Sequence, residues 1–167
     1  DALPFIVFAH APGTYGEGFG ENPPEDDEKF ADYVGAVVQR YNDFCKENRM
    51  IKPCDINQWY FEIWNEPYTD VWWKDNLPRY VKLFNVVNAK IKTIAPNIKV
   101  GGFGTWFLGI KNKYRLKKFL QNSQMDFVSI HHYGNIVNKY ASEEQKMKDV
   151  KFISYDSILE LRDFIKK

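Results

Sequence analysis

The stretch Trp59-Tyr60-Phe61-Glu62-Ile63-Trp64-Asn65-Glu66-Pro67 decides the fold of this 167-residue chain. Aromatic and β-branched side chains dominate its first part, which is typical of a strand, and we expect that strand to span about residues 58–65. Pro67 cannot donate to a strand ladder, so the strand ends where Asn65 and Glu66 lie. A carboxyl group at the C-terminal tip of a buried strand is the usual location of chemistry in α/β folds. The stretch therefore predicts that Glu66 is a catalytic acid/base.

Strand-like and helix-like segments alternate on both sides of this stretch. Short apolar runs predict further strands at 4–8, 99–104 and 125–131. Apolar residues at helical spacing predict a helix after each strand: most clearly after Pro24, then at 80–94, more weakly near 114–121, and last at 158–165. Strict alternation implies parallel strands joined by right-handed crossovers. Two architectures fit this order: an open doubly wound sheet and part of a (β/α)8 barrel.

The residues at the strand ends favour the barrel. Each predicted strand leads into polar or aromatic groups: His10, then Asn65 and Glu66, then Trp106, then His131 and Tyr133. An open sheet concentrates its site at one switch point, whereas a barrel collects residues from many strand ends at one mouth. No Gly-x-Gly-x-x-Gly or P-loop motif follows a strand, which argues against a nucleotide site. We therefore expect an α/β fold in which residues 1–167 form a single domain, a partial (β/α)8 TIM barrel of about four βα units.

Two other polar residues need an interpretation beside Glu66. By strict alternation Glu62 shares a face with Trp64 and Glu66, and we interpret it as a buried, paired group of the barrel interior rather than as a catalyst. His131 fits a core histidine and a site residue about equally well. Tyr133 lies two residues further on and is expected to point the same way.

Composition excludes several classes of function. Hydrophobic residues make up 44% of the chain, charged residues 27%, and the net charge is +1, so nothing favours nucleic acid or an anionic membrane as a partner. The chain has no apolar run of about 18 residues, and therefore no expected membrane span. His and Cys spacing suggests no metal, and we expect no cofactor. The high aromatic content, 17%, fits a large core and also fits a carbohydrate site.

The chain contains two cysteines, Cys45 and Cys54. Cys45 falls on the apolar side of the first predicted helix, so we expect a buried free thiol, with a Cys45–Cys54 bridge as the alternative. Neither outcome assigns a cellular compartment.

The motif Trp59-x-Phe61-Glu62-Ile63-Trp64-Asn65-Glu66-Pro67, followed by Trp73 and the helix at Tyr80, resembles glycoside hydrolase family 39. That family contains β-xylosidases and α-L-iduronidase and belongs to a clan of (β/α)8 retaining hydrolases. The resemblance implies a carbohydrate substrate, Glu66 as general acid/base and Asn65 as its substrate-binding neighbour. It also implies that His131 and Tyr133 line the sugar pocket, and Tyr133 favours a neutral sugar such as xylose. His10 and Trp106 are further substrate-binding candidates, from their positions at strand ends.

The resemblance runs from about the third strand to the sixth helix of the family's barrel. In the family the nucleophilic Glu ends the seventh strand, which has no counterpart here. We therefore expect an exo-acting, β-xylosidase-like retaining hydrolase whose nucleophile and remaining barrel lie outside these residues, and we expect the 167-residue segment alone to be inactive. The alternatives are an endo-acting glycanase of the same clan and a non-catalytic carbohydrate-binding protein on a degenerate barrel.

Overall fold

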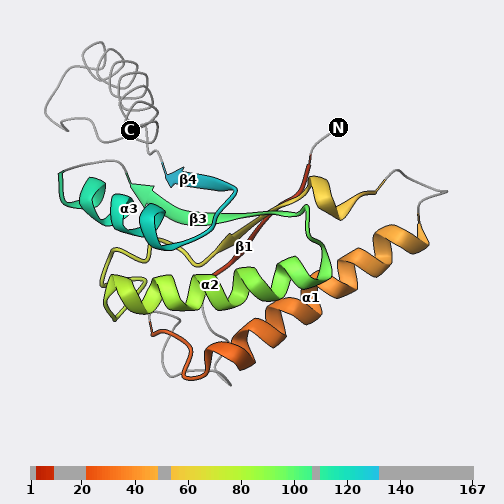
Figure 1. Ribbon diagram of the computed structural model, residues 1–167, viewed down its shortest axis with the longest axis horizontal. Helices are drawn as coiled ribbons and strands as arrows, with labels where there is room; N and C mark the ends of the chain where they lie inside the picture. The colour runs from red at the N-terminus through yellow and green to blue at the C-terminus, as the bar shows by residue number, and fades with distance from the viewer. Residues whose placement is uncertain (1–2, 10–21, 49–53, 107–109, 132–167) are drawn as a thin grey trace, which may run out of the picture. The chain divides into compact units, whose positions relative to one another are not determined.

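The structure is a computed structural model that describes residues 3–9, 22–48, 54–106 and 110–131 (Figure 1). Of residues 105–106 and 110–113 it describes the backbone alone. The chain divides into two compact units, Asp1–Ile130 and His131–Lys167. Only His131 of the second unit is described, so the predicted helix near 158–165 lies outside the described residues, and the single-domain organisation stays a prediction.

The described part contains a four-stranded sheet with the spatial order β1-β2-β3-β4. Its strands are β1 (Phe5–Phe8), β2 (Tyr60–Ile63), β3 (Lys99–Trp106) and β4 (Phe127–His131). β1 pairs with β2, and β2 with β3, in parallel. The strands follow one another across the sheet without a reversal, whereas a doubly wound sheet reverses its order at a switch point. The α/β fold with a parallel sheet is confirmed, and closure into a barrel stays a prediction.

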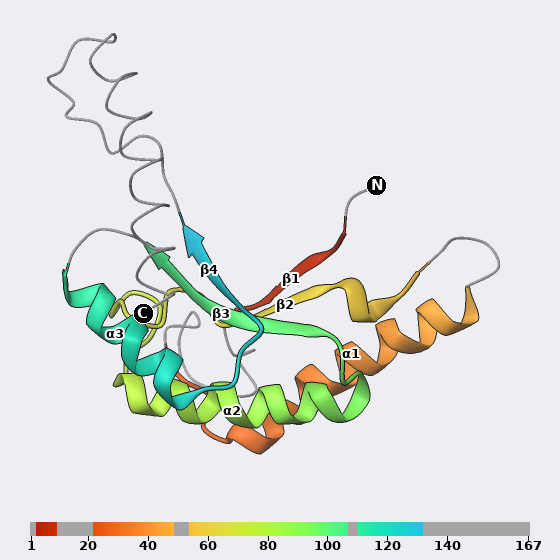
Figure 2. The ribbon, with the colours of Figure 1, turned by 45° about the horizontal axis from the view of Figure 1, so that its top comes forward.

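Three helices connect the strands: α1 (Asp27–Glu47), α2 (Leu77–Ile94) and α3 (Ile110–Asn122). The Asp26 side chain caps α1 by accepting bonds from the Glu28 and Lys29 N–H groups. The Asn76 side chain accepts from the Arg79 N–H at the start of α2. α1 and α2 run along the same side of the sheet (Figures 1 and 2). This arrangement creates one core layer between the sheet and the helices.

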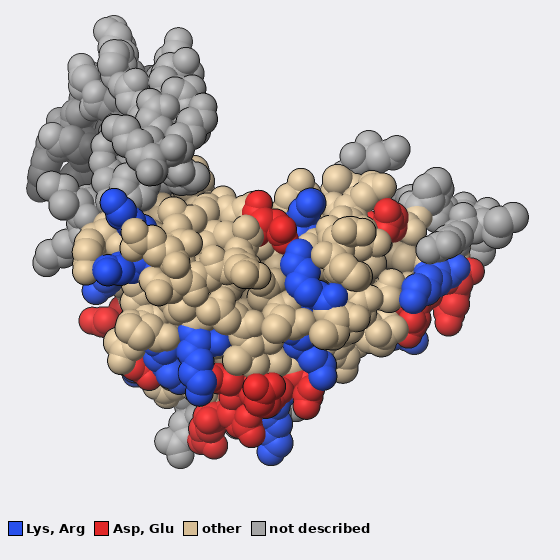
Figure 3. Space-filling model, in the orientation of Figure 1, with Lys and Arg blue, Asp and Glu red and all other residues tan. Residues whose placement is uncertain are grey.

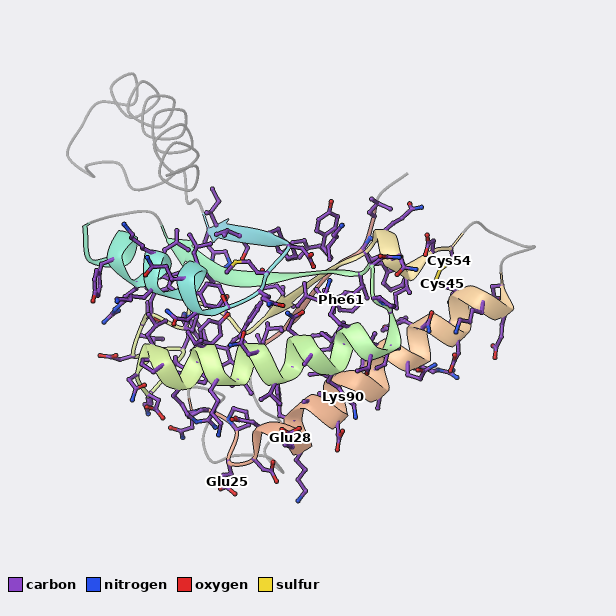
Figure 4. The ribbon with its side chains drawn as sticks, viewed as in Figure 1. Glu25, Glu28, Cys45, Cys54, Phe61 and Lys90 are labelled. Carbon is purple, nitrogen blue, oxygen red and sulfur yellow. A yellow bond between two sulfur atoms is a disulfide. The ribbon has the colours of Figure 1, made fainter. Side chains whose placement is uncertain are left out.

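Aromatic side chains fill that layer. Phe61 is fully buried between the sheet and α2 (Figure 4), and its ring stacks on Phe8 at 5.8 Å. Tyr80, Phe84 and Phe119 form a second group, with ring centroids 4.9–6.3 Å apart. Each such ring removes a large apolar area from water. The aromatic content of the described residues is therefore used largely in the core.

The other face of the sheet carries no helix among the described residues. Phe5, Val7 and Tyr60 lie in register on this face and are 51%, 44% and 37% exposed. The ring of Phe127 packs edge-on against both Phe5 and Tyr60. An apolar face of this kind requires a cover, and a closed barrel would supply one from its remaining strands.

Cys45 and Cys54 form a disulfide (Figure 4), so the expected free thiol was wrong. Cys45 is buried, as expected, in the last turns of α1. The chain returns toward the sheet at Cys54, just before the short 3-10 helix Ile56–Gln58. The return brings the two Cα atoms to 4.9 Å, which lies within the range that a disulfide can bridge.

Acidic and basic side chains lie beside one another on the face that Figure 3 shows. In Figure 3 the acidic groups gather near the start of α1, with lysine and arginine side chains beside them. Asp27 is 6% exposed there, and it forms ion pairs with Arg79 and Lys82 of α2 at 2.5 and 3.2 Å. Asp27 therefore ties the start of α1 to α2.

Candidate active site

The C-terminal end of β2 has an unusual backbone. The strand ladder ends with the Trp64 N–H donating to the Phe8 carbonyl at 2.9 Å. Trp64 and Glu66 then adopt φ angles of 68° and 43°. Left-handed φ is rare for a residue as bulky as tryptophan, and each such residue costs about 1–3 kcal/mol. Strain of this kind clusters at functional sites, which makes this turn the leading candidate in the described residues.

The turn is closed on its far side by Thr69. Its N–H and Oγ1 both donate to the Glu66 carbonyl, at 3.1 and 3.2 Å. Asn65 and Glu66 are both partly exposed. The two bonds hold the backbone of Glu66, and the residue stays partly exposed.

Trp64 does not lie where strict alternation placed it. It is fully buried on the helix side of the sheet, with its ring 6.0 Å from Phe30 of α1 and 5.1 Å from Trp73. Its Nε1–H donates to the Trp72 carbonyl at 2.6 Å. The predicted common face with Glu62 was therefore wrong for Trp64, because the left-handed residue breaks the period of two at the end of the strand.

Glu62 is a buried, paired group, as the sequence predicted. Its side chain is 2% exposed and accepts a 2.7 Å hydrogen bond from Ser129 Oγ of β4. The same hydroxyl accepts a bond from the Gly104 N–H at 2.9 Å. Gly101 lies beside Glu62 in the sheet, and a Cβ there would come within 2.3 Å of the Phe127 carbonyl oxygen. The missing side chain lets β4 approach closely, so Ser129 reaches across β3 to β2.

The loop after Glu66 is anchored to β3 and α3. The ring of Tyr68 stacks on Phe103 at 5.6 Å, and its hydroxyl donates to the Gly104 carbonyl at 3.5 Å. The Arg115 guanidinium of α3 donates to the Tyr68 carbonyl. Phe103 and Gly104 also have positive φ, 87° and 45°. The end of β2 and the middle of β3 therefore both leave regular strand geometry, and Tyr68 connects the two.

Tyr80 of α2 lies beneath these two segments. Its hydroxyl donates to the Ile63 carbonyl at 2.8 Å. Burial raises the pKa of Tyr80 well above its usual value, the charge of Glu62 raises it further, and a backbone hydrogen bond with Phe103 acts in the opposite direction. The hydroxyl consequently stays protonated, and remains a donor, at neutral pH.

Polar side chains of α2 fix the connection that leads into β4. Asn88 Nδ2 donates to the Gln124 carbonyl at 2.6 Å, and Lys92 Nζ lies 2.7 Å from Asp126 Oδ2. The same carboxyl oxygen accepts from the Val100 N–H at 2.8 Å. Burial tends to raise the pKa of Asp126, but the Lys92 and Val100 bonds and the nearby lysine charges hold it below the usual value.

The other predicted site residues fall at strand ends or outside the described residues. Trp106 is the last residue of β3 and His131 the last residue of β4; His131 is partly exposed, and the side chain of Trp106 is not described. His10 and Tyr133 lie outside the described residues. Sequence reasoning did not identify Ser129 or Tyr80, although the adjacent glycines of β3 were a signal that other groups approach closely there.

The described residues hold neither a metal-type cluster of side chains nor a membrane-length apolar helix. No group of three or more His, Cys, Asp or Glu side chains there could hold a metal ion. Among the described helices, none combines the length and the apolar character needed to cross a bilayer.

These features define an α/β protein with parallel strands in sequential order and a carboxyl-bearing turn at a strand end. The chain belongs to glycosyl hydrolases family 39, whose model matches residues 2–167. The family resemblance predicted from the sequence is thereby confirmed.

The proteins similar to the chain include two curated beta-xylosidases and a solved beta-xylosidase structure. It is 33% identical to a beta-xylosidase of Geobacillus stearothermophilus over 108 residues, 59% of this chain and 20% of the relative. It is 31% identical to a beta-xylosidase of Caldicellulosiruptor saccharolyticus over 86 residues, 47% of this chain and 16% of the relative. A monomeric beta-xylosidase from Caulobacter crescentus CB15 matches with a TM-score of 0.53 at 25% identity, covering 86% of this chain and 28% of that one. The chain thus spans about a fifth of the length of the curated relatives it matches.

Proposed function

We propose that this chain supplies the general acid/base, Glu66, of a retaining, exo-acting glycoside hydrolase of the β-xylosidase type. The observation that carries the proposal is the Glu66 turn itself. It presents a partly exposed carboxyl group at the end of β2, on a backbone with two left-handed residues, in a chain of family 39. The names of the two curated relatives support a xyloside as substrate.

The proposed chemistry gives Glu66 two tasks. In the first step it protonates the departing glycosidic oxygen while a second carboxylate attacks the sugar. In the second step it removes a proton from water, which then releases the sugar from the enzyme. The two carboxyl groups of a retaining enzyme lie about 5 Å apart. Glu62 does not take the second role, because it is buried and bonded to Ser129, and we place the nucleophile outside residues 1–167.

The remaining predicted residues are assigned to substrate binding. Asn65 adjoins Glu66 and is partly exposed, so its amide is available to a sugar hydroxyl. His131 and Trp106 end β4 and β3, and a barrel collects such positions at one mouth. We assign His10 and Tyr133 the same role from their sequence positions. The exposed apolar face of the sheet supports a remaining barrel that covers it.

The proposal is tested by dependence on the leaving group, using Glu66→Gln in the full-length protein that carries this chain. An amide cannot donate the proton, so kcat/KM for xylobiose should fall about 10²–10⁴-fold. A dinitrophenyl β-xyloside needs no proton to depart, so its kcat/KM, which reports the first step, should fall less than about tenfold. The control is Glu25→Gln, an exposed carboxyl group before α1 (Figure 4), which should leave both values unchanged. An equal loss on both substrates refutes the assignment, and activity on polymers alone would favour an endo-acting glycanase.

A further inference from the structure

Tyr80 is fully buried, and the only polar atom of its side chain, the hydroxyl oxygen, is directed at the candidate site. It lies in the first turns of α2, and its ring packs against Trp73, Phe103 and Phe119 at centroid distances of 5.7, 6.3 and 5.2 Å. A phenylalanine would satisfy all three contacts. The hydroxyl therefore has a purpose that apolar packing does not explain.

That hydroxyl contacts the backbone where β2 ends. It donates at 2.8 Å to the carbonyl of Ile63, the last residue of the strand. The Ile63 carbonyl belongs to the peptide unit that leads into Trp64, the first left-handed residue of the turn. A hydrogen bond on this carbonyl fixes the plane of that peptide unit, and so the direction in which the chain continues to Glu66.

The same hydroxyl also reaches β3. The Phe103 backbone in the middle of β3, where φ is 87°, acts to lower the pKa of this hydroxyl against the effect of burial. Gly102 leaves the space for this contact, because a Cβ there would lie 2.8 Å from Tyr80 Oη and 3.1 Å from the Ile63 carbonyl oxygen. A side chain at Gly102 would thus take the space of the Tyr80–Ile63 hydrogen bond.

We propose that the Tyr80 hydroxyl is a positioning group that holds the turn from Trp64 to Glu66 in its reactive conformation by donating to the Ile63 carbonyl at the end of β2. The inference rests on the proposed role of Glu66. Proton transfer depends on where the carboxyl group lies relative to the departing oxygen, and a displacement of about 1 Å can cost about 10²-fold in rate. The left-handed residues are strained, so loss of a bond that maintains them allows the turn to relax.

The test is Tyr80→Phe in the full-length protein, with the two xyloside substrates described above. Because a mispositioned acid matters only when the leaving group needs a proton, kcat for xylobiose should fall about 10- to 100-fold with little change in KM. The kcat/KM for the dinitrophenyl substrate should stay within about threefold of wild type. The control is Val87→Ala, which creates a cavity on the same buried face of α2, about two helical turns after Tyr80. It should lower the melting temperature, but any loss of activity should be of similar size on both substrates.

Gly102→Ala provides a second variant that keeps the tyrosine ring. It should reproduce the loss of activity that depends on the leaving group, because its methyl group displaces the Tyr80 hydroxyl. In the variant that combines Gly102→Ala with Tyr80→Phe, the two losses should not add, because Phe has no hydroxyl to displace. A loss of equal size on both substrates, or no loss in either variant, overturns the positioning role. If instead Glu66→Gln itself shows no leaving-group dependence, the proposed function fails.

Discussion

Removing the Ser129 hydroxyl should destabilise the described fold more than the same change at a typical surface serine. The hydroxyl donates to Glu62 at 2.7 Å and accepts from the Gly104 N–H at 2.9 Å. A hydrogen bond to a charged group contributes about 1.5–3 kcal/mol, and an N–H group left without its acceptor costs about 1 kcal/mol or more. Since Ser129 is partly exposed, water replaces part of the loss. We expect Ser129→Ala to lower the free energy of unfolding by about 2–4 kcal/mol.

The assay is urea unfolding followed by tryptophan fluorescence, which reports on the buried Trp64 and Trp73. The matched control is Ser123→Ala, whose hydroxyl donates only to the Phe119 carbonyl one helical turn earlier. That change should cost less than about 0.5 kcal/mol. If Ser129→Ala unfolds at the same urea concentration as Ser123→Ala with an unchanged m-value, the Glu62–Ser129 connection does not stabilise the sheet and the reasoning is refuted.

Three further predictions concern the frame around the site. Replacing both Cys45 and Cys54 with serine, which opens a loop with a sequence separation of 9, should lower the free energy of unfolding by about 2–3 kcal/mol, and a reducing agent should then have no additional effect on the urea midpoint. Gly101→Ala should cost about 3 kcal/mol or more in the same assay, because its Cβ meets the Phe127 backbone oxygen at 2.3 Å; a wild-type midpoint would contradict that contact. The lowered pKa of Asp126 stabilises the fold above the unfolded carboxyl value of about 3.9, and this contribution is lost as pH falls toward the lower folded value. A plot of stability against pH should therefore be flatter in Asp126→Asn, and unchanged steepness below about pH 4 would count against this assignment.

Local pattern predicted the elements of the fold well. Apolar runs placed all four described strands, and helical spacing placed α1 and α2. The burial of Glu62 followed from alternation along β2. These successes share one cause: the period of side chains along a strand or helix is set by local geometry and is visible in the sequence.

The features that the sequence did not predict depend on which residues lie close together in the folded chain. The direction of Trp64 depends on a left-handed residue, which no local pattern of a Trp-Asn-Glu sequence specifies. The Cys45–Cys54 disulfide depends on how the chain returns after α1. Ser129, the partner of Glu62, lies 67 residues away in sequence. Tyr80 looked like one more apolar helix residue, and only its hydroxyl at Ile63 connects it to the site.

The central claim is that Glu66 acts as general acid/base of a retaining enzyme, and azide distinguishes this role from the alternatives. In Glu66→Ala of the full-length protein, azide needs no general base to attack the sugar bound to the enzyme, so turnover of a dinitrophenyl β-xyloside should rise with azide concentration. The product should be the β-xylosyl azide, in which the configuration of the substrate is retained. An α-xylosyl azide would instead identify Glu66 as the nucleophile, and the absence of any azide product would contradict the acid/base role.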